Sequence, residues 1–434
     1  MKDNKIFYGW VIIAVAFITL GVVFGLWYSF SVFLLAIKTE FSWSVSTVSS
    51  IFSVFLVSHS LFGLAAGYLQ DRFGSRVVIP IGSVILSFSL VLTSRSENLF
   101  DFLISYGILA GAGISMMGYI SHSAFLPKWF EKKRGLAIGI ATAGIGLGML
   151  TIVPLSERII SLYGWRKAYL VFSLVFFVII GPLNLILGRK SPEDVAKSEE
   201  NESAAAKGKR ISAPHRKLQV VDEKWVATEW DIILAAKTFR FWHLLFSFFF
   251  ISFCVQGVLL HAVNAMVDCN VDKFKAAYYL GIAGIAGSVG KILFGYCSDV
   301  IGREYSKLIS DGIAILGIIA LIHISSRPET FGVLFALLFG LGYGAAAPLI
   351  PTISADIFLG NRFGQIFSFI AIGGGIGGAT GTYVCGLLRD VTMHYSIALW
   401  VCCLALAISC ALVFLAAPGK VRKSVLVNRT TTAF

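Results

Sequence analysis

One loop pattern occurs twice in this chain, 228 residues apart, and each copy lies between two long apolar segments. The first copy reads GYLQDRFGSR from Gly67, and the second reads GYCSDVIGR from Gly295. Glycine patterns elsewhere recur at an offset of 229 residues, as in LAGAG at 109–113 and LFGLG at 338–342. The chain therefore consists of two related halves. The residues of the repeated loop are Gly67, Asp71, Arg72, Gly74 and Arg76 in the first half, and Gly295, Asp299, Gly302 and Arg303 in the second.

The composition indicates that both halves lie in a membrane. Hydrophobic residues make up 57% of the 434 residues, and the mean hydropathy is +0.81. A bilayer core of roughly 30 Å is crossed by about 20 helical residues. We predict an all-α membrane protein with twelve transmembrane helices in two pseudo-symmetric six-helix bundles. The expected spans are 8–36, 45–70, 77–94, 101–127, 135–160, 166–188, 239–267, 276–298, 306–325, 330–354, 364–388 and 394–416.

The charges indicate which side of the membrane each loop occupies. We expect an N-terminal bundle at 1–188, a cytoplasmic linker at 189–238, a C-terminal bundle at 239–417 and a cytoplasmic tail at 418–434. With that topology, 26 of the 36 Lys and Arg residues lie on the side of both termini and 9 on the other side. The positive-inside rule then places both termini in the cytoplasm. The net charge of +12 reflects this bias, so no nucleic-acid partner is expected.

Two of the predicted spans are rich in glycine. The fifth contains GLAIGIATAGIGLG from Gly135, and the eleventh contains GGGIGGATG from Gly373. Small residues at helical spacing let two helix backbones approach closely. Tight packing within a bundle and a face on which the halves move against each other are both compatible with this pattern.

The twin loops resemble the loop motif of the major facilitator superfamily, between spans two and three and again between spans eight and nine. A narrower resemblance rests on WFEKKRGLAIGIATAGIGLG at 129–148, which is similar to the fifth-span signature of the monocarboxylate transporter family, and on the opening Tyr8-Gly9-Trp10, which is typical of its bacterial members. The oxalate–formate exchanger branch is related. The resemblance implies a two-bundle fold with a central site for a small carboxylate, often carried with a proton.

The same resemblance implies roles for single residues. The substrate-binding cation of the family corresponds to Lys291, where the family usually has Arg. The acidic residue of animal members, four positions earlier, is replaced by Gly287. The second cation of the oxalate branch corresponds to Ile370. The twin loops are expected to hold the halves together at the cytoplasmic side in one state, and so to affect rate and not substrate choice.

Lys291 also stands out on physical grounds. It lies 8 residues before Asp299, about 12 Å from the cytoplasmic interface at 1.5 Å per residue. A Lys at that depth costs at least about 2.5–3.5 kcal/mol unless it faces water or a counter-charge. The span interiors contain almost no acidic residue, so a substrate anion is the natural partner. One cation neutralises one carboxylate, which favours a monocarboxylate.

Polar aromatic side chains at similar depth are further candidates for substrate contact. Tyr28, Tyr119 and Tyr343 lie in the first, fourth and tenth spans, and a phenol can donate a hydrogen bond to a carboxylate. His261 in the seventh span can bind substrate or pass a proton. Packing and a hydrogen bond to a backbone carbonyl are the alternative for each residue, and for His59 and His122 as well.

Two coupling mechanisms remain open at this point. Lys291 can release its proton in an apolar interior, whereas an Arg would stay charged, so proton and carboxylate could move together. In the alternative, Lys291 stays charged and exchanges one anion for another. His261 is the second candidate proton carrier.

We predict a secondary active transporter of a lactate- or pyruvate-like monocarboxylate, working by alternating access in the cytoplasmic membrane with a proton as co-substrate. The alternatives are an oxalate- or formate-like exchanger, a carrier of a larger organic anion, and a sensor that kept a transporter fold. The sequence shows no metal-ligand spacing among its seven Cys, no nucleophile triad and no phosphate-binding loop, so no cofactor and no enzymatic activity are expected. We expect a monomer to suffice.

Overall fold

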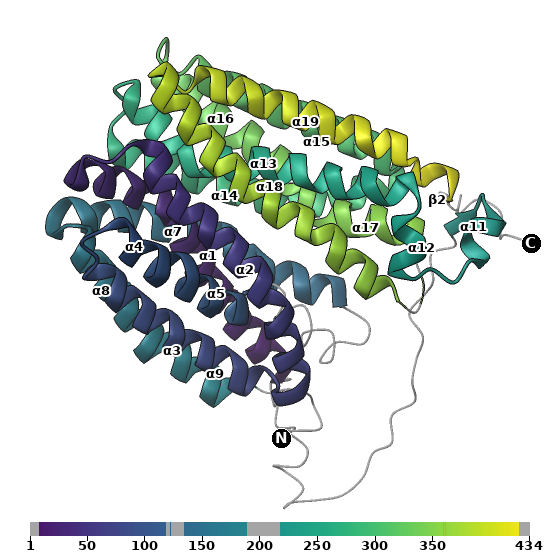
Figure 1. The fold of residues 1–434 in the computed structure, drawn as a ribbon, viewed down its shortest axis with the longest axis horizontal. Helices are drawn as coiled ribbons and strands as arrows, with labels where there is room; N and C mark the ends of the chain where they lie inside the picture. Colours follow the sequence, from purple (N-terminus) through teal and green to yellow (C-terminus); the bar gives the residue numbers. More distant parts are fainter. Residues whose placement is uncertain are drawn as a thin grey trace, which may run out of the picture.

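A computed structural model describes residues 8–118, 122, 134–188, 218–358, 360 and 362–424. In these residues, twelve helices are long and apolar enough to cross a membrane, as predicted. They form two bundles, which Figure 1 shows in purple to blue for the first half and in teal to yellow for the second. The all-helical, two-bundle prediction is thus confirmed.

The first half supplies six of these spans. Two of them contain a π-helical segment, and the fourth ends earlier than predicted in the described residues, at Met117. The elements are α1 (Tyr8–Phe41), α2 (Val45–Phe73), α3 (Ser75–Ser94), α4 (Leu99–Phe102), η1 (Leu103–Ala110), α5 (Gly111–Met117), α7 (Arg134–Tyr163), α8 (Trp165–Val175), η2 (Phe176–Ile180) and α9 (Gly181–Leu187).

The second half repeats this arrangement and adds short elements at one end. Its spans are α13 (Phe239–Asp268), α14 (Lys273–Val300), α15 (Arg303–Ile322), α16 (Pro328–Gly344) with α17 (Ala346–Phe358), α18 (Phe363–Thr392) and α19 (Ser396–Ala416). The short elements are β1 (Leu218–Val220), α11 (Glu223–Ala227), α12 (Ile232–Ala236), the 3₁₀ turn η4 (Pro418–Lys420) and β2 (Arg422–Ser424).

The second glycine of each repeated loop makes a turn that other residues rarely adopt. Gly74 has φ 79° and joins α2 to α3, and Gly302 has φ 96° between α14 and α15. Because a Cβ is strained at such angles, these positions favour glycine. The turns reverse the chain within one or two residues, which explains why the pattern recurs at the same place in both halves.

The glycines of the two glycine-rich spans lie at close contacts both within a bundle and between the halves. In α7, Gly144 and Gly148 lie directly against the backbone of α1 at Phe17 and Gly21, and in α18 Gly377 lies against Phe249 of α13. These contacts hold each bundle together. Other glycines of the same two helices, including Gly146 and Gly375, face the opposite half.

The segment after residue 217 and the beginning of the tail are not separate from the second bundle, which corrects the predicted linker and tail. Strand β1 pairs antiparallel with β2, and Trp230 of the connecting segment is buried against Phe358 with the rings 5.3 Å apart. Arg422 donates hydrogen bonds to the carbonyl oxygens of Ala355 and Asp356. The aromatic side chain of Trp230 is thus buried on the second bundle.

A second correction concerns the beginning of α15. The helix begins at Arg303, three residues before the expected span 306–325, and Lys307 is fully buried in it and pairs with Asp311. The two side chains lie four residues apart, so they face each other on one side of the helix. A hydropathy scale scores each charged residue separately, so it does not recognise a buried ion pair in which the two charges neutralise each other.

Candidate functional site

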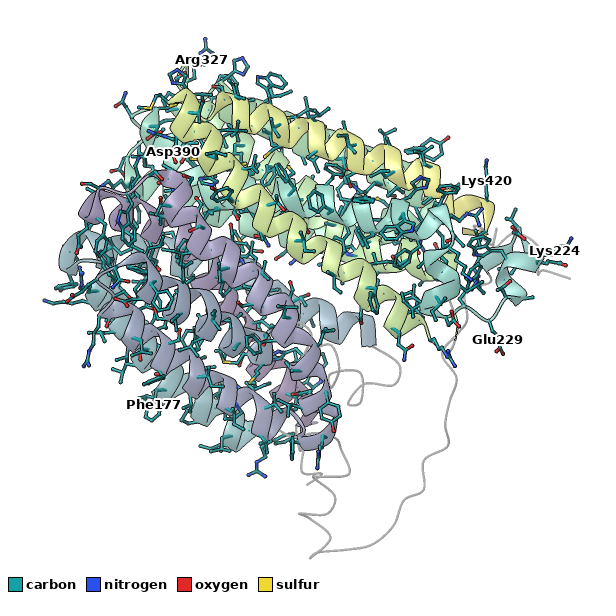
Figure 2. The ribbon with its side chains drawn as sticks, in the orientation of Figure 1. Phe177, Lys224, Glu229, Arg327, Asp390 and Lys420 are labelled. Carbon is teal, nitrogen blue, oxygen red and sulfur yellow. The ribbon has the colours of Figure 1, made fainter. Side chains whose placement is uncertain are left out.

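The two halves contact each other closely at one end of the molecule. We call it the closed end; it is where α1 ends, α2 begins and α18 ends. The carboxylate of Asp390 in α18 accepts hydrogen bonds from the backbone N–H groups of Val45 (2.9 Å) and Ser46 (2.7 Å) at the N-terminus of α2. Figure 2 shows Asp390 at this junction. A negative charge is stabilised at a helix N-terminus, so this contact joins the halves electrostatically.

Further polar contacts between the halves follow Asp390 toward the middle of the molecule. Ser53 of α2 donates to the carbonyl oxygen of Ala379 in α18 at 2.8 Å and lies 2.8 Å from the hydroxyl of Thr382. Asn264 of α13 donates to the carbonyl oxygen of Ser31 in α1 at 2.9 Å. These side chains are all buried or half-buried, so the closed end is sealed by hydrogen bonds as well as by packing.

The contact between the halves stops beyond the middle of the helices. On the facing side of α2 and α18, a Cβ added to Gly386, Gly378 or Gly375 would meet Ser49, Leu56 or Ser60 of the other half. Farther along the same faces, a Cβ added to Gly67 or Gly364 would meet nothing within 4 Å. In Figure 1 the helices of the two halves are closest at the left and diverge toward the right. We call this diverging end, which contains both repeated loops, the motif end.

Lys291 lies where this divergence begins. On α14, a Cβ added to Gly281 would lie 2.8 Å from Leu150 of α7, and Ser288 lies directly against Gly146 of α7. Lys291 follows Ser288 by three residues on the same side of the helix. The outward-facing side of α14 is opposite, at the exposed side chains of Val289, Ile292 and Tyr296.

The ammonium group of Lys291 has no protein counter-charge. The side chain is half-buried, and it makes no hydrogen bond or ion pair with any residue in the part of the chain that the structure describes. It lies 18 residues from the beginning of α14 at the closed end, about 27 Å along the helix, and 9 residues, about 14 Å, from its other end. A lone cation at this depth favours an anion that arrives from solution.

Two of the predicted tyrosines lie near the same level. The hydroxyl of Tyr343 in α16 is buried 3.7 Å from the sulfur of Met149 in α7, so it spans the two halves. Gly287, one turn before Lys291, makes room for this phenol, because an added Cβ there would be 2.6 Å from the Tyr343 oxygen. Tyr28 of α1 is half-buried and packs against the hydrophobic clusters of both halves. Tyr119 lies outside the described residues.

His261 lies at a different level from Lys291. It is seven residues from the end of α13, about 10 Å from the closed end. Its Nε2 lies 2.9 Å from the carbonyl oxygen of Thr382 and its Nδ1 lies 3.3 Å from the hydroxyl of Tyr395. Both ring nitrogens are therefore engaged by the second half itself, and Ser49 of the first half approaches Nε2 at 3.4 Å. In this structure His261 belongs to the contact between the halves.

The residues of the repeated loops bond within their own halves. Arg76 donates to the carbonyl oxygen of Leu185. Arg303 donates to the carboxylates of Asp299 and Asp356, both at 2.8 Å. Asp356 lies two residues beyond the predicted tenth span, and the sequence did not predict this partnership. The only signal in the sequence was the short separation between Asp356 and the end of the tenth span, because Arg303 and Asp356 lie on different helices.

Comparison with known proteins agrees with this architecture. The sequence profile of the Major Facilitator Superfamily matches residues 15–382. Monocarboxylate transporter 13 of Bos taurus is 23% identical over 389 residues, which is 90% of this chain and 84% of that protein. The uncharacterized MFS-type transporter YcxA of Bacillus subtilis is 25% identical over 392 residues, 88% of each chain.

Solved structures share the fold. A D-xylose–proton symporter superposes with a TM-score of 0.69 at 16% identity, covering 94% of this chain and 97% of that one. A bacterial homologue of the lysosomal transporter Spinster, in an inward-facing and occupied conformation, gives 0.68 at 15% identity and covers 96% and 98%. These relatives are transporters and not enzymes. With a profile match over most of its length and twelve membrane-spanning helices in two related halves, this chain belongs to the major facilitator superfamily.

Proposed function

We propose that this transporter carries a small monocarboxylate, such as lactate or pyruvate, together with a proton. The observation that carries the proposal is the position of Lys291: a single half-buried cation without a described partner, at the point where the two halves begin to separate. The transport of monocarboxylates by relatives such as monocarboxylate transporter 13 supports it.

The surroundings of Lys291 suit one carboxylate and not two. One turn before Lys291 on the same face of α14, Gly287 lies against the Tyr343 phenol, which carries no positive charge. The Lys291 ammonium would neutralise a carboxylate, and a phenol hydroxyl would donate a hydrogen bond to it. A second carboxylate at this level would stay uncompensated in a medium of low dielectric constant, which is costly.

The proposed mechanism is alternating access. This structure represents the state open at the motif end, in which Asp390 and Ser53 hold the closed end together. In the opposite state these bonds break, and the repeated loops, with Asp71, Arg72 and Arg76 in one half and Asp299 and Arg303 in the other, approach each other. The loops would thus set the balance between states and leave substrate choice to the central residues.

The proposed orientation follows from the charges. The beginning of α1, strand β2 near the end of the described chain and both repeated loops lie at the motif end, and the predicted topology assigns most of the Lys and Arg residues to the same side. By the positive-inside rule, this end faces the cytoplasm, and the membrane is the cytoplasmic membrane of the cell. The state described here is then the inward-open one. Lys291 and Tyr343 both belong to one chain, and we propose that a monomer is active.

Uptake into proteoliposomes tests the proposal. Radiolabelled lactate, pyruvate, formate and oxalate would be offered with and without an inward proton gradient to the wild type, Lys291→Ala and the control Lys273→Ala. Lys273 is an exposed cation at the closed end of the same helix. We expect gradient-driven accumulation of a monocarboxylate by the wild type and the control, and loss of uptake in Lys291→Ala.

Three other outcomes would change the proposal. Uptake only against preloaded internal anion would make the protein an exchanger. Uptake of oxalate in preference to lactate would exclude a monocarboxylate site. No uptake of any small acid by the wild type would indicate a larger organic anion as cargo.

A further inference from the structure

His59 occupies the centre of the first half. It is the fifteenth of the 29 residues of α2, about 21 Å from the helix beginning at Val45. It lies eight residues before Gly67, just as Gly287 lies eight residues before Gly295 in the second copy of the loop pattern. His59 is therefore the counterpart, in the first half, of the position one turn before Lys291.

The imidazole of His59 lies between α1 and the end of α5. Its ring meets the indole of Trp27 edge to face, with the ring centres 4.8 Å apart and the planes at 86°. Helix α5 approaches α2 so closely that a Cβ added to Gly111 would lie 3.1 Å from the His59 backbone nitrogen. A Cβ added to Gly118 would lie 3.7 Å from His59 Nε2. The ring nitrogen thus points to the place where the helical segment from Leu99 to Met117 ends.

The helical segment that packs on His59 is interrupted beside its ring. Gly118 has an extended backbone, with ψ −167°, so the segment from Leu99 to Met117 ends here. The carbonyl oxygen of Gly118 accepts from the backbone N–H of His122 at 3.3 Å and leaves His59 without a partner among the described residues. An imidazole is the side chain that gains and loses a proton most readily near neutral pH. His59 can therefore hold one proton in the centre of the first half.

No fixed charge competes at this position in the part of the chain that the structure describes. The groups packed on His59 are Trp27 and Phe55, and the nearest titratable groups behind them are the phenols of Tyr28 and Tyr106. On α5, the Gly118 carbonyl lies 3.0 Å from the ring of His122. His59 itself is half-buried and makes no hydrogen bond to a described residue, so the unprotonated nitrogen of its neutral ring remains available to a proton.

We infer that His59 binds the proton that moves with the carboxylate. This rests on the proposed function, and it assigns the two charges to different halves: the proton to His59 in the first half and the anion to Lys291 in the second. The proton enters from the side of the closed end when that end is open and leaves to the motif end, and no bond other than N–H forms or breaks. Lys291 then stays charged, and His261, whose ring nitrogens are already engaged, stays in the contact between the halves.

Proteoliposome transport separates this role from a structural one. His59→Gln keeps a polar side chain of similar size and removes the titration, and His323→Gln removes an exposed histidine at the closed end as a control. For each protein, lactate accumulation under an inward proton gradient is compared with lactate exchange at equal pH on both sides. We expect His59→Gln to lose at least tenfold in accumulation while exchange stays within twofold of wild type.

Calorimetry gives an independent count of protons. Lactate binding to the purified protein is measured in two buffers of different ionisation enthalpy, which yields the number of protons taken up. One proton for the wild type and none for His59→Gln, or for His59→Asn where Gln does not give a monodisperse protein, supports the assignment. One proton in both overturns it and returns the role to Lys291.

The outcomes also distinguish this inference from the proposed function. A wild type that accumulates lactate with protons and a His59→Gln protein that does the same would overturn only the role of His59. A wild type that transports no monocarboxylate, or transports it by exchange without proton movement, would overturn the proposed proton symport and this inference with it.

Discussion

The hydroxyl of Tyr343 lies 3.7 Å from the sulfur of Met149 and joins helix α16 of the second half to helix α7 of the first. A thioether sulfur is a weak acceptor, so this bond can be exchanged for a stronger one at little cost. Gly287 leaves the space in which the phenol sits. Under the proposed function, Tyr343 turns from Met149 to the substrate anion at Lys291, which lies one helical turn beyond Gly287.

Replacing Tyr343 with Phe should weaken substrate binding without abolishing transport. Because a hydrogen bond to a charged group is worth about 1.5–3 kcal/mol, we expect KM for the substrate to rise about tenfold or more. Initial rates of uptake over a range of substrate concentrations measure this. Tyr305→Phe, at an exposed position of α15, is the matched control, and an unchanged KM for Tyr343→Phe would exclude contact with the substrate.

Adding one methyl group at Gly146 should shift the protein away from the state described here. A Cβ at this position would collide with Ser288 of the opposite half, whereas one at Gly139, two turns along the same face of α7, would meet nothing within 4 Å. Overpacking costs about 1–3 kcal/mol, so Gly146→Ala should reduce the turnover rate while Gly139→Ala stays close to wild type. Equal rates for the two variants would contradict the contact of α7 with α14.

Neutralising Asp390 should loosen the closed end. Its carboxylate accepts from the first two backbone N–H groups of α2, and such a cap contributes about 0.5–2 kcal/mol. In Asp390→Asn we therefore expect a larger population of molecules open at that end. Spin labels at the exposed Lys167 of the first half and Lys273 of the second would show a longer-distance component in the variant. An unchanged distance distribution would mean that packing alone holds the ends together.

Removing Arg303 should destabilise the second half. Its guanidinium pairs with Asp299 and Asp356, and the Asp356 side chain is only 6% exposed. Breaking a buried pair by removing one partner costs about 3–5 kcal/mol, because the other charge stays behind. The Tm of Arg303→Gln in detergent should fall clearly below that of the wild type.

A double variant separates this charge effect from lost packing. In Arg303→Gln with Asp356→Asn, the uncompensated carboxylate is gone, so part of the lost stability should return. A double variant no more stable than the single one would show that the Arg303 side chain acts through packing and not through its charge.

Part of the candidate site could be predicted from residues that differ in type from their neighbours in the sequence. Lys291 stands out because it is a charge in an apolar run, and the loop glycines because they recur at one offset. The burial of Lys307 was not predicted, because its partner, Asp311, is one helical turn away and a hydropathy scale scores the two charges separately. Trp230 and β1 were assigned to a linker because their partners, Phe358 and β2, are more than a hundred residues away in sequence.

The sequence by itself determined the membrane environment, the twelve spans and the division into two related halves, because these depend on local hydrophobicity and on a repeat within the chain. Only the tertiary structure decided which faces of the halves meet, that Ser288 contacts Gly146 about one turn before Lys291, and that His261 belongs to the closed end while His59 lies in the centre beside the end of α5. Those relations depend on how helices that are distant in the sequence pack together, and a single sequence does not show which side chains will contact each other.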